Sequence, residues 1–171
     1  WNAATMRPAR CSDLYQRTGN PRQLITIVGV TLAALDTRDP HPELLEFLAA
    51  TPADPLLQRA HGLVLLMQGR PQEARPYLDA AISALDDDPI GRLALAECRL
   101  DTRQLDGVEP ALGPEPTRPA ERARWWFLRG RVAESRGQTD RALELWRHAV
   151  TPDTHDREAL YHMGQVLVRQ K

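Results

Sequence analysis

The chain has 171 residues, of which 42% are hydrophobic and 26% are charged, and its formal net charge is −1. These values are ordinary for a globular protein, and a near-neutral balance disfavours a general nucleic-acid binder, whose affinity depends on a strongly basic surface. No apolar run approaches the ~20 residues that a membrane-spanning helix needs, and no basic amphipathic segment favours a membrane surface. We therefore expect neither nucleic-acid binding nor insertion into a membrane.

Apolar residues recur with helical spacing along most of the chain, which predicts an all-α fold. A short helix is expected near 8–18, before the Gly-Asn-Pro turn at 19–21. After it, first and second helices of successive pairs are expected to alternate. These predicted helices lie near 22–36, 41–50, 55–68, 71–84, 89–101, 105–112, 121–136, 139–150 and 157–170.

Proline and glycine residues mark the expected helix ends. Pro55 and Pro89 stand where a helix begins, because the fixed φ of proline and its missing N–H are tolerated in the first turn. Gly69 and Gly137 fall just before the second helix of a pair, where a residue that tolerates positive φ ends the first helix. The three prolines within 113–119 cannot continue a helix, so the second helix before them is expected to be short.

Two further prolines, Pro76 and Pro110, occupy equivalent places inside second helices. A proline there removes a backbone hydrogen bond and crowds the preceding turn of the helix. We therefore expect each of these two helices either to bend or to begin late.

Small residues recur every 34 positions, at Gly62, Ala96, Gly130 and Gly164. A strict period of this length is typical of stacked two-helix units, in which the small residue lets neighbouring helices approach closely. Other positions follow the same period, with alanine or a large apolar residue on the second helices and Trp126 on a first helix. The second-helix positions are Ala74, Leu78, Ala81, Ala142, Trp146 and Ala149.

This pattern resembles the tetratricopeptide repeat family, whose units combine a large residue and a glycine in the first helix with alanine and an aromatic residue in the second. The match is best over 123–156, through Trp126, Gly130 and Ala142. The resemblance covers roughly residues 21–171. It implies an α-solenoid, which is a superhelix of stacked antiparallel helix pairs.

The resemblance also implies how the chain is divided. Trp1 is no translation start and the last predicted helix has no second helix after it, so we expect a fragment of a longer chain or an end covered by another copy. The expected parts are 1–20, a helix of a preceding unit or an N-terminal extension; 21–54, a divergent unit; 55–88, a unit; 89–122, a degenerate unit with a shortened second helix; 123–156, a unit; and 157–171, the first helix of a truncated unit.

No motif in the sequence predicts catalysis, a metal site or a cofactor. Cys11 and Cys98 are isolated, without the CxxC spacing of a zinc or redox pair, so we interpret both as buried, inert thiols. The five histidines include no HExxH pattern, and no glycine-rich phosphate-binding loop is present. The acidic run 86–88 lacks the alternating ligands of a calcium loop, and its charge instead favours the start of a helix at Pro89.

In tetratricopeptide proteins the concave groove is lined mainly by the first helix of each pair, so the resemblance implies a surface that binds a protein or peptide. We expect Arg59, Arg124 and Arg131 to meet an acidic or carboxylate-bearing ligand, because the guanidinium fork matches a carboxylate. Phe127 and Tyr161 would be the anchoring aromatic residues. The other groove residues carried over are Leu63, Met67, Glu97 and Gln165.

These groove assignments have a structural alternative. The arginines would instead form ion pairs with acidic residues of neighbouring units, such as Glu97, Asp101 and Glu134, with little gain in stability. Leu63 and Met67 would pack against the previous unit and would not contact a ligand.

The most direct functional interpretation is a non-catalytic scaffold that binds a peptide or protein partner in its groove. The alternative is an accessory or regulatory segment of a larger enzyme or assembly machine, whose chemistry lies outside these residues. Self-association through the uncovered last helix is a third candidate. The 21 arginines against a single lysine indicate a G+C-rich, bacterial genome, and the absence of a disulfide pattern favours the cytoplasm.

Overall fold

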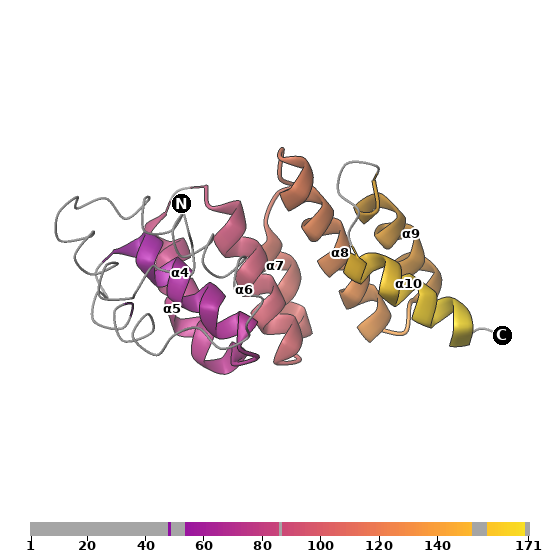
Figure 1. The fold of residues 1–171 in the computed structure, drawn as a ribbon, viewed down its shortest axis with the longest axis horizontal. Coiled ribbons are helices and arrows are strands. Elements are labelled where there is room, and N and C mark those ends of the chain that lie inside the picture. The colour runs from indigo at the N-terminus through magenta and orange to yellow at the C-terminus, as the bar shows by residue number, and fades with distance from the viewer. Residues whose placement is uncertain (1–47, 49–53, 86, 152–156, 170–171) are drawn as a thin grey trace, which may run out of the picture. The chain divides into compact units, whose positions relative to one another are not determined.

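The part of the chain that the structure describes is helical and contains no strand (Figure 1). The all-α prediction is therefore confirmed for these residues. The helices predicted near 8–18 and 22–36, and most of the one near 41–50, lie outside them. The computed structural model describes residue 48 and residues 54–85, 87–151 and 157–169.

The helices of the described residues begin and end within about two residues of the predicted bounds. The bounds could be predicted because proline and glycine residues indicate where a helix starts or stops. The elements are α4 (Pro55–Met67), α5 (Pro71–Ala84), α6 (Pro89–Asp101), the 3₁₀ turn η2 (Leu105–Gly107), α7 (Val108–Leu112), α8 (Pro119–Ser135), α9 (Thr139–Ala149) and α10 (Arg157–Arg169).

The chain divides into two compact units, Trp1–Asp88 and Pro89–Lys171. In the first unit α4 packs along α5, and the short connection between the two helices makes the pair antiparallel. In the second unit α8 packs along α9 in the same way, and α6 packs against α7. Helix α8 also contacts α6, and α10 contacts α9.

Several helices begin at a proline. The carboxylate of Asp54 accepts the N–H of Leu56 at 2.9 Å and so caps α4, whose first residue is Pro55. The predicted starts at Pro55 and Pro89 are confirmed. Helix α8 begins at Pro119, two residues earlier than expected, because the last proline of the 113–119 segment serves as the first residue of the helix.

Three first helices end in the same hydrogen-bonded turn. Gly69 and Gly137 have φ values of +72° and +73°, as predicted, and Arg103 stands at the equivalent position of α6 with φ +59°. In each turn the N–H of the next residue reaches back to a carbonyl five residues earlier, for example from Gln104 to Arg99 at 2.7 Å. Arg103 therefore holds a left-handed conformation that costs an L-residue about 1–2 kcal/mol.

Pro76 lies inside α5, for which the sequence predicts either a bend or a late start, and the start is not delayed. The helix is continuous from Pro71 to Ala84. Pro76 has no N–H to donate to the carbonyl of Gln72, but both residues are exposed, and water at such a surface can supply the missing hydrogen bond. The proline is therefore tolerated in the helix interior.

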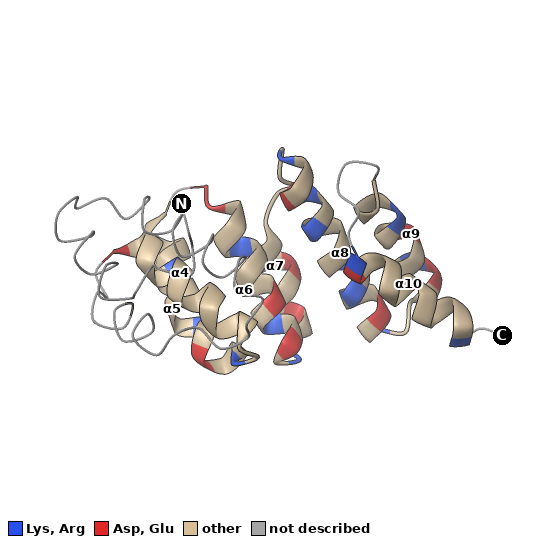
Figure 2. Cartoon of the chain, in the orientation of Figure 1, with Lys and Arg blue, Asp and Glu red and all other residues tan. Residues whose placement is uncertain are grey.

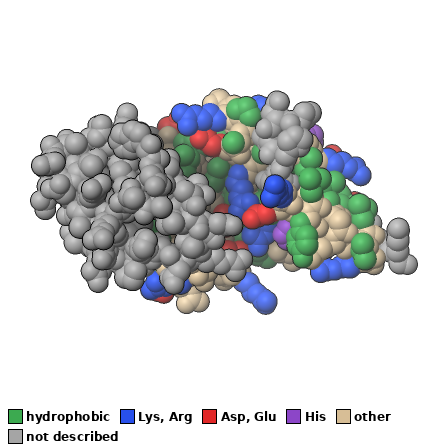
Figure 3. Space-filling model, viewed as in Figure 1, with side chains coloured by type: hydrophobic (Ala, Val, Ile, Leu, Met, Phe, Trp, Pro, Cys, Tyr) green, Lys and Arg blue, Asp and Glu red, His purple; other side chains and the backbone are tan. Residues whose placement is uncertain are grey.

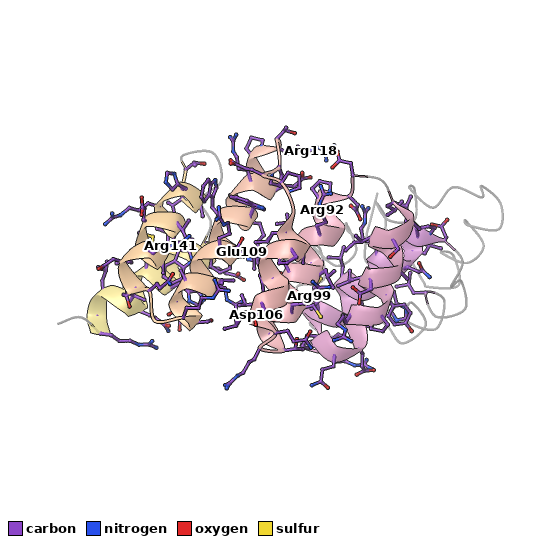
Figure 4. The ribbon with its side chains drawn as sticks, turned by 180° about the vertical axis from the view of Figure 1, so that it is seen from behind. Arg92, Arg99, Asp106, Glu109, Arg118 and Arg141 are labelled. Atoms are coloured by element: carbon purple, nitrogen blue, oxygen red, sulfur yellow. The ribbon has the colours of Figure 1, made fainter. Side chains whose placement is uncertain are left out.

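Pro110 has the effect that the sequence predicts. The segment before it is a 3₁₀ turn, and the chain becomes α-helical only at Val108, so that α7 has five residues. Arg99 of α6 donates to the carbonyl of Gly107 at 2.7 Å and holds this turn against the first helix (Figure 4). Gly113, with φ +61°, then leads into the non-helical residues that precede α8.

Two small residues of the 34-residue period, Gly62 and Gly130, lie where the second helix of the pair packs closely on the first. A Cβ atom on Gly62 would stand 2.6 Å from the side chain of Leu78, and one on Gly130 would overlap the indole of Trp146. The Nε1–H of Trp146 donates to the carbonyl of Phe127 at 3.1 Å, which requires this close approach. The second-helix positions of the period, Ala74, Leu78, Ala81, Ala142, Trp146 and Ala149, all have 0% exposure, as does Ala96 on a first helix.

Replacing Gly130 with Ala should destabilise the second unit by about 1–3 kcal/mol, because the new methyl group displaces the Trp146 indole and breaks its hydrogen bond to Phe127. This loss should exceed the gain of about 1 kcal/mol in helix propensity. Urea unfolding followed by circular dichroism measures the change. The matched control is Gly164→Ala, where no atom lies within 4 Å of the added Cβ and stability should stay equal or rise. Equal stability of Gly130→Ala and the unmutated chain would contradict this packing.

Replacing Arg103 with Gly should stabilise the protein by about 1 kcal/mol, since glycine adopts positive φ without steric cost. The free energy of unfolding from denaturant titration reports the effect. Gly137→Ala, at the equivalent turn, should lower stability by a similar amount. A less stable Arg103→Gly variant would show that the arginine side chain contributes more than its backbone strain removes.

Candidate functional site

The charged residues predicted for the groove of the second unit lie on its three first helices, α6, α8 and α10. Arg124 of α8 donates to Glu97 of α6 at 2.5 Å and to Glu158 of α10 at 2.5 Å. One guanidinium group thus joins three successive first helices. Figure 2 shows the acidic and basic positions of these helices.

Two further contacts run between the same helices. Arg131 of α8 donates to Asp101 of α6 at 3.1 Å. His162 of α10 lies 3.5 Å from the carboxylate of Glu134 on α8, measured from Nδ1 to Oε2. We call this set of residues the ion-pair row; its members are Glu97, Asp101, Arg124, Arg131, Glu134, Glu158 and His162.

The exposure of the ion-pair row varies from residue to residue. The side chain of Arg124 is 27% exposed, and its two partners differ, with Glu97 28% and Glu158 62% exposed. Burial alone would lower the pKa of Arg124, but the charges and hydrogen bonds of Glu97 and Glu158 raise it above the ordinary value for arginine. The guanidinium is therefore charged under all ordinary conditions.

Phe127 is not an exposed anchor, and that prediction is wrong. Its side chain is 1% exposed, with the guanidinium of Arg124 4.8 Å from its ring centroid and the ring of His162 5.5 Å away. The residue is one helical turn from Arg124, and its ring lies against His162 of α10. Phe127 therefore packs against the guanidinium of Arg124 and makes a cation–π contact with it.

The other predicted groove residues are divided between the two units. Tyr161, which is 64% exposed, and the half-buried Gln165 lie on α10 in the second unit. In the first unit, α4 carries Leu63, which is half-buried, and Met67, which is 51% exposed. The last residue, Arg59, is also on α4.

Arg59 is already paired within the first unit. Its Nη1 donates to Oδ1 of Asp88 at 2.7 Å, and the two side chains are only 15% and 6% exposed. Asp88 comes directly before Pro89, and its negative charge was predicted to favour the start of the helix there. In the structure its carboxylate also pairs with Arg59. The spacing of 29 residues between the partners follows no local pattern, so sequence reasoning missed the pair.

The contact between His162 and Glu134 was also missed by sequence reasoning. His162 falls outside the groove positions that the family pattern assigns, and it faces Glu134 because it lies on the side of α10 that turns toward α8. Little in the sequence indicated this contact, since a lone histidine on a helix is most often a packed residue. Here its ring also packs near Trp146, at 5.4 Å between centroids.

Within the described ranges, no three His, Cys, Asp or Glu side chains are placed to hold a metal ion together. Cys98 is a buried free thiol, and Cys11 lies outside those ranges. His61 is buried against the ring of Tyr77; burial, aided by the nearby charge of Arg70, lowers its pKa. None of the helices in the described part of the chain has the length and apolar content needed to cross a bilayer.

Comparison with known proteins identifies the repeat. Two family models, both described as tetratricopeptide repeat, match the chain, one over residues 65–131 and the other over residues 32–89. No curated protein matches the chain. The two matches together span residues 32–131, more than half of the sequence, and they agree with paired helices that meet at small residues. The chain therefore belongs to the tetratricopeptide repeat family.

Proposed function

We propose that the chain is a non-catalytic scaffold that binds an acidic protein or peptide segment on the ion-pair row of the second unit. Tetratricopeptide repeats generally mediate protein–protein interaction and are typically non-catalytic. The observation that supports this particular surface is the half-buried guanidinium of Arg124, held between two carboxylates on neighbouring first helices.

The two carboxylates on Arg124 are not equally held. Glu158 is 62% exposed, and an exposed ion pair contributes only about 0–1 kcal/mol, so a ligand carboxylate can replace it at little cost. Glu97 is more buried and keeps the guanidinium in position during such an exchange. The incoming carboxylate would form a charge-assisted hydrogen bond with the group that Glu158 releases.

Arg131 offers a second guanidinium whose carboxylate partner a ligand could replace. Its partner Asp101 is 37% exposed and lies at the end of α6. Arg124 and Arg131 are seven residues apart on one helix, which corresponds to about 10 Å along its axis. An extended peptide covers that distance in about three residues. In a polyproline II segment, side chains three residues apart lie on the same face and about 9 Å from each other. The partner best suited to this surface is therefore a segment of that conformation with acidic side chains three residues apart.

Replacing Glu158 with Gln should increase the affinity for such a segment several-fold, because the ligand then competes with a neutral side chain. Replacing Arg124 with Gln should reduce the affinity by about tenfold or more through loss of a charge-assisted bond. The measurement is fluorescence anisotropy with a labelled Glu-x-x-Glu peptide, at low and at physiological salt.

The control variant is Arg141→Gln, which removes an exposed arginine of α9 outside the ion-pair row (Figure 4). It changes the net charge as Arg124→Gln does and should leave binding unchanged. A Lys-x-x-Lys peptide of the same length tests the sign of the preference. Equal affinity of the three variants and the unmutated chain, or equal binding of both peptides, would refute an acid-binding role for Arg124.

A further inference from the structure

His162 differs in kind from the other members of the ion-pair row. Imidazole is the side-chain group that ordinarily gains or loses a proton between about pH 5 and pH 8, whereas carboxylate and guanidinium groups ordinarily stay charged over that range. Figure 3 shows acidic, basic and histidine side chains close together on one face of the second unit. The charge of this surface can therefore change near neutral pH through one residue of the row.

The ring of His162 is held between aromatic side chains of two other helices. Its centroid lies 5.5 Å from that of Phe127 on α8 and 5.4 Å from that of Trp146 on α9. In this position Nδ1 lies 3.5 Å from Oε2 of Glu134. The Nδ1 atom is enclosed, and within the described part of the chain it has no hydrogen-bond partner. A proton on this nitrogen therefore faces a carboxylate.

The charged groups around His162 belong to α8 and to its own helix. Glu134 faces it from α8, and Glu158 stands one helical turn earlier on the same side of α10. Arg124 and Arg131 of α8 are the like charges of this surface, and both are bonded to carboxylates. The ring neighbours, which ordinarily carry no charge near neutral pH, are Phe127 of α8, Trp146 of α9 and Tyr161 of α10.

Carboxylates outnumber guanidinium groups in the ion-pair row. When His162 is neutral, four carboxylates stand against two guanidinium groups. This excess repels an acidic ligand that approaches either arginine, because like charges across an interface oppose binding. A proton on His162 reduces the excess by one charge.

A charged His162 also favours the exchange of carboxylates on the two arginines. When a ligand displaces Glu158 from Arg124, the released side chain has a cation four residues later on its own helix, in the favourable order of acid before base. Glu134 stands three residues after Arg131 and so neighbours it on α8. The imidazolium offsets the repulsion that Glu134 exerts on a ligand carboxylate at Arg131.

We propose that protonation of His162 increases the affinity of the ion-pair row for its acidic partner. The inference rests on the acid-binding function proposed above and concerns its regulation. Imidazole is charged below its pKa and neutral above it, so binding should strengthen as the pH falls from about 7.5 to about 5.5. Glutamate side chains of the ligand ordinarily stay ionised down to about pH 5, so the ligand keeps its charge over this range. The partner would be held more tightly under mildly acidic conditions and released as the pH rises.

Fluorescence anisotropy of the labelled Glu-x-x-Glu peptide, measured at about pH 7.5 and about pH 5.5 with equal ionic strength, tests the proposal. The affinity of the unmutated chain should rise about threefold or more at the lower pH. His162→Gln cannot gain a proton and should lose this rise. Glu134→Gln should bind more tightly at the higher pH, because the repelling carboxylate is gone, and should show a smaller rise. Circular dichroism at both pH values checks that each chain is folded.

The matched control is His148→Gln, which removes an exposed histidine of α9 whose ring packs near Trp126 and not against the ion-pair row. This variant should keep the full pH response. Equal affinity of the unmutated chain at both pH values, or a full response in His162→Gln, would overturn the proposal. Absence of peptide binding at both pH values would refute the acid-binding function as well, whereas binding without a pH response refutes the regulation alone.

Discussion

Close packing of a glycine against a large side chain sets the geometry of the helix pairs. Gly130 lets the indole of Trp146 lie directly on α8, close enough to donate a hydrogen bond to a backbone carbonyl. Gly62 and Leu78 make the corresponding contact between α4 and α5. A side chain at either glycine would push the two helices of its pair apart.

The ion-pair row connects the first helices of the second unit. Arg124 of α8 reaches Glu158 of α10, which stands one 34-residue period later, and also Glu97 of α6, which is 27 residues earlier and so lies at a different turn of its helix. The pairs contribute little to stability individually, since each remains partly exposed. The pairs hold charged groups in defined positions on the surface. In our proposal, a ligand carboxylate there replaces the more exposed acidic partner of Arg124.

Most of the fold could be predicted from the sequence because proline and glycine restrict the backbone directly. The exceptions are instructive. Arg103 adopts the conformation of the glycines at the equivalent turns, which its residue type conceals. Pro76 does not delay α5, because its exposed position lets water replace the missing donor. In both cases solvent exposure or the surrounding turn outweighs the residue's own preference.

The candidate site was less predictable, because helical spacing gives the direction of a side chain and not its neighbours. The pattern placed Glu97 and Arg124 on one surface, and their contact follows from the packing of two helices. It also placed Phe127 there, although that ring is buried and lies against His162 of α10. The pairing of Arg59 with Asp88 joins residues that no short-range rule connects.

The position of the tryptophans gives the molecule an internal optical label. Trp125, Trp126 and Trp146, which are the indoles within the described residues, all belong to the second unit, and only Trp146 is fully enclosed. A blue-shifted emission from Trp146 therefore reports the contact between α8 and α9, whereas far-ultraviolet dichroism averages over every helix. In a Trp1→Phe variant, which removes the one tryptophan of the sequence outside the second unit, comparing the two signals distinguishes cooperative melting of the whole chain from separate melting of its two units.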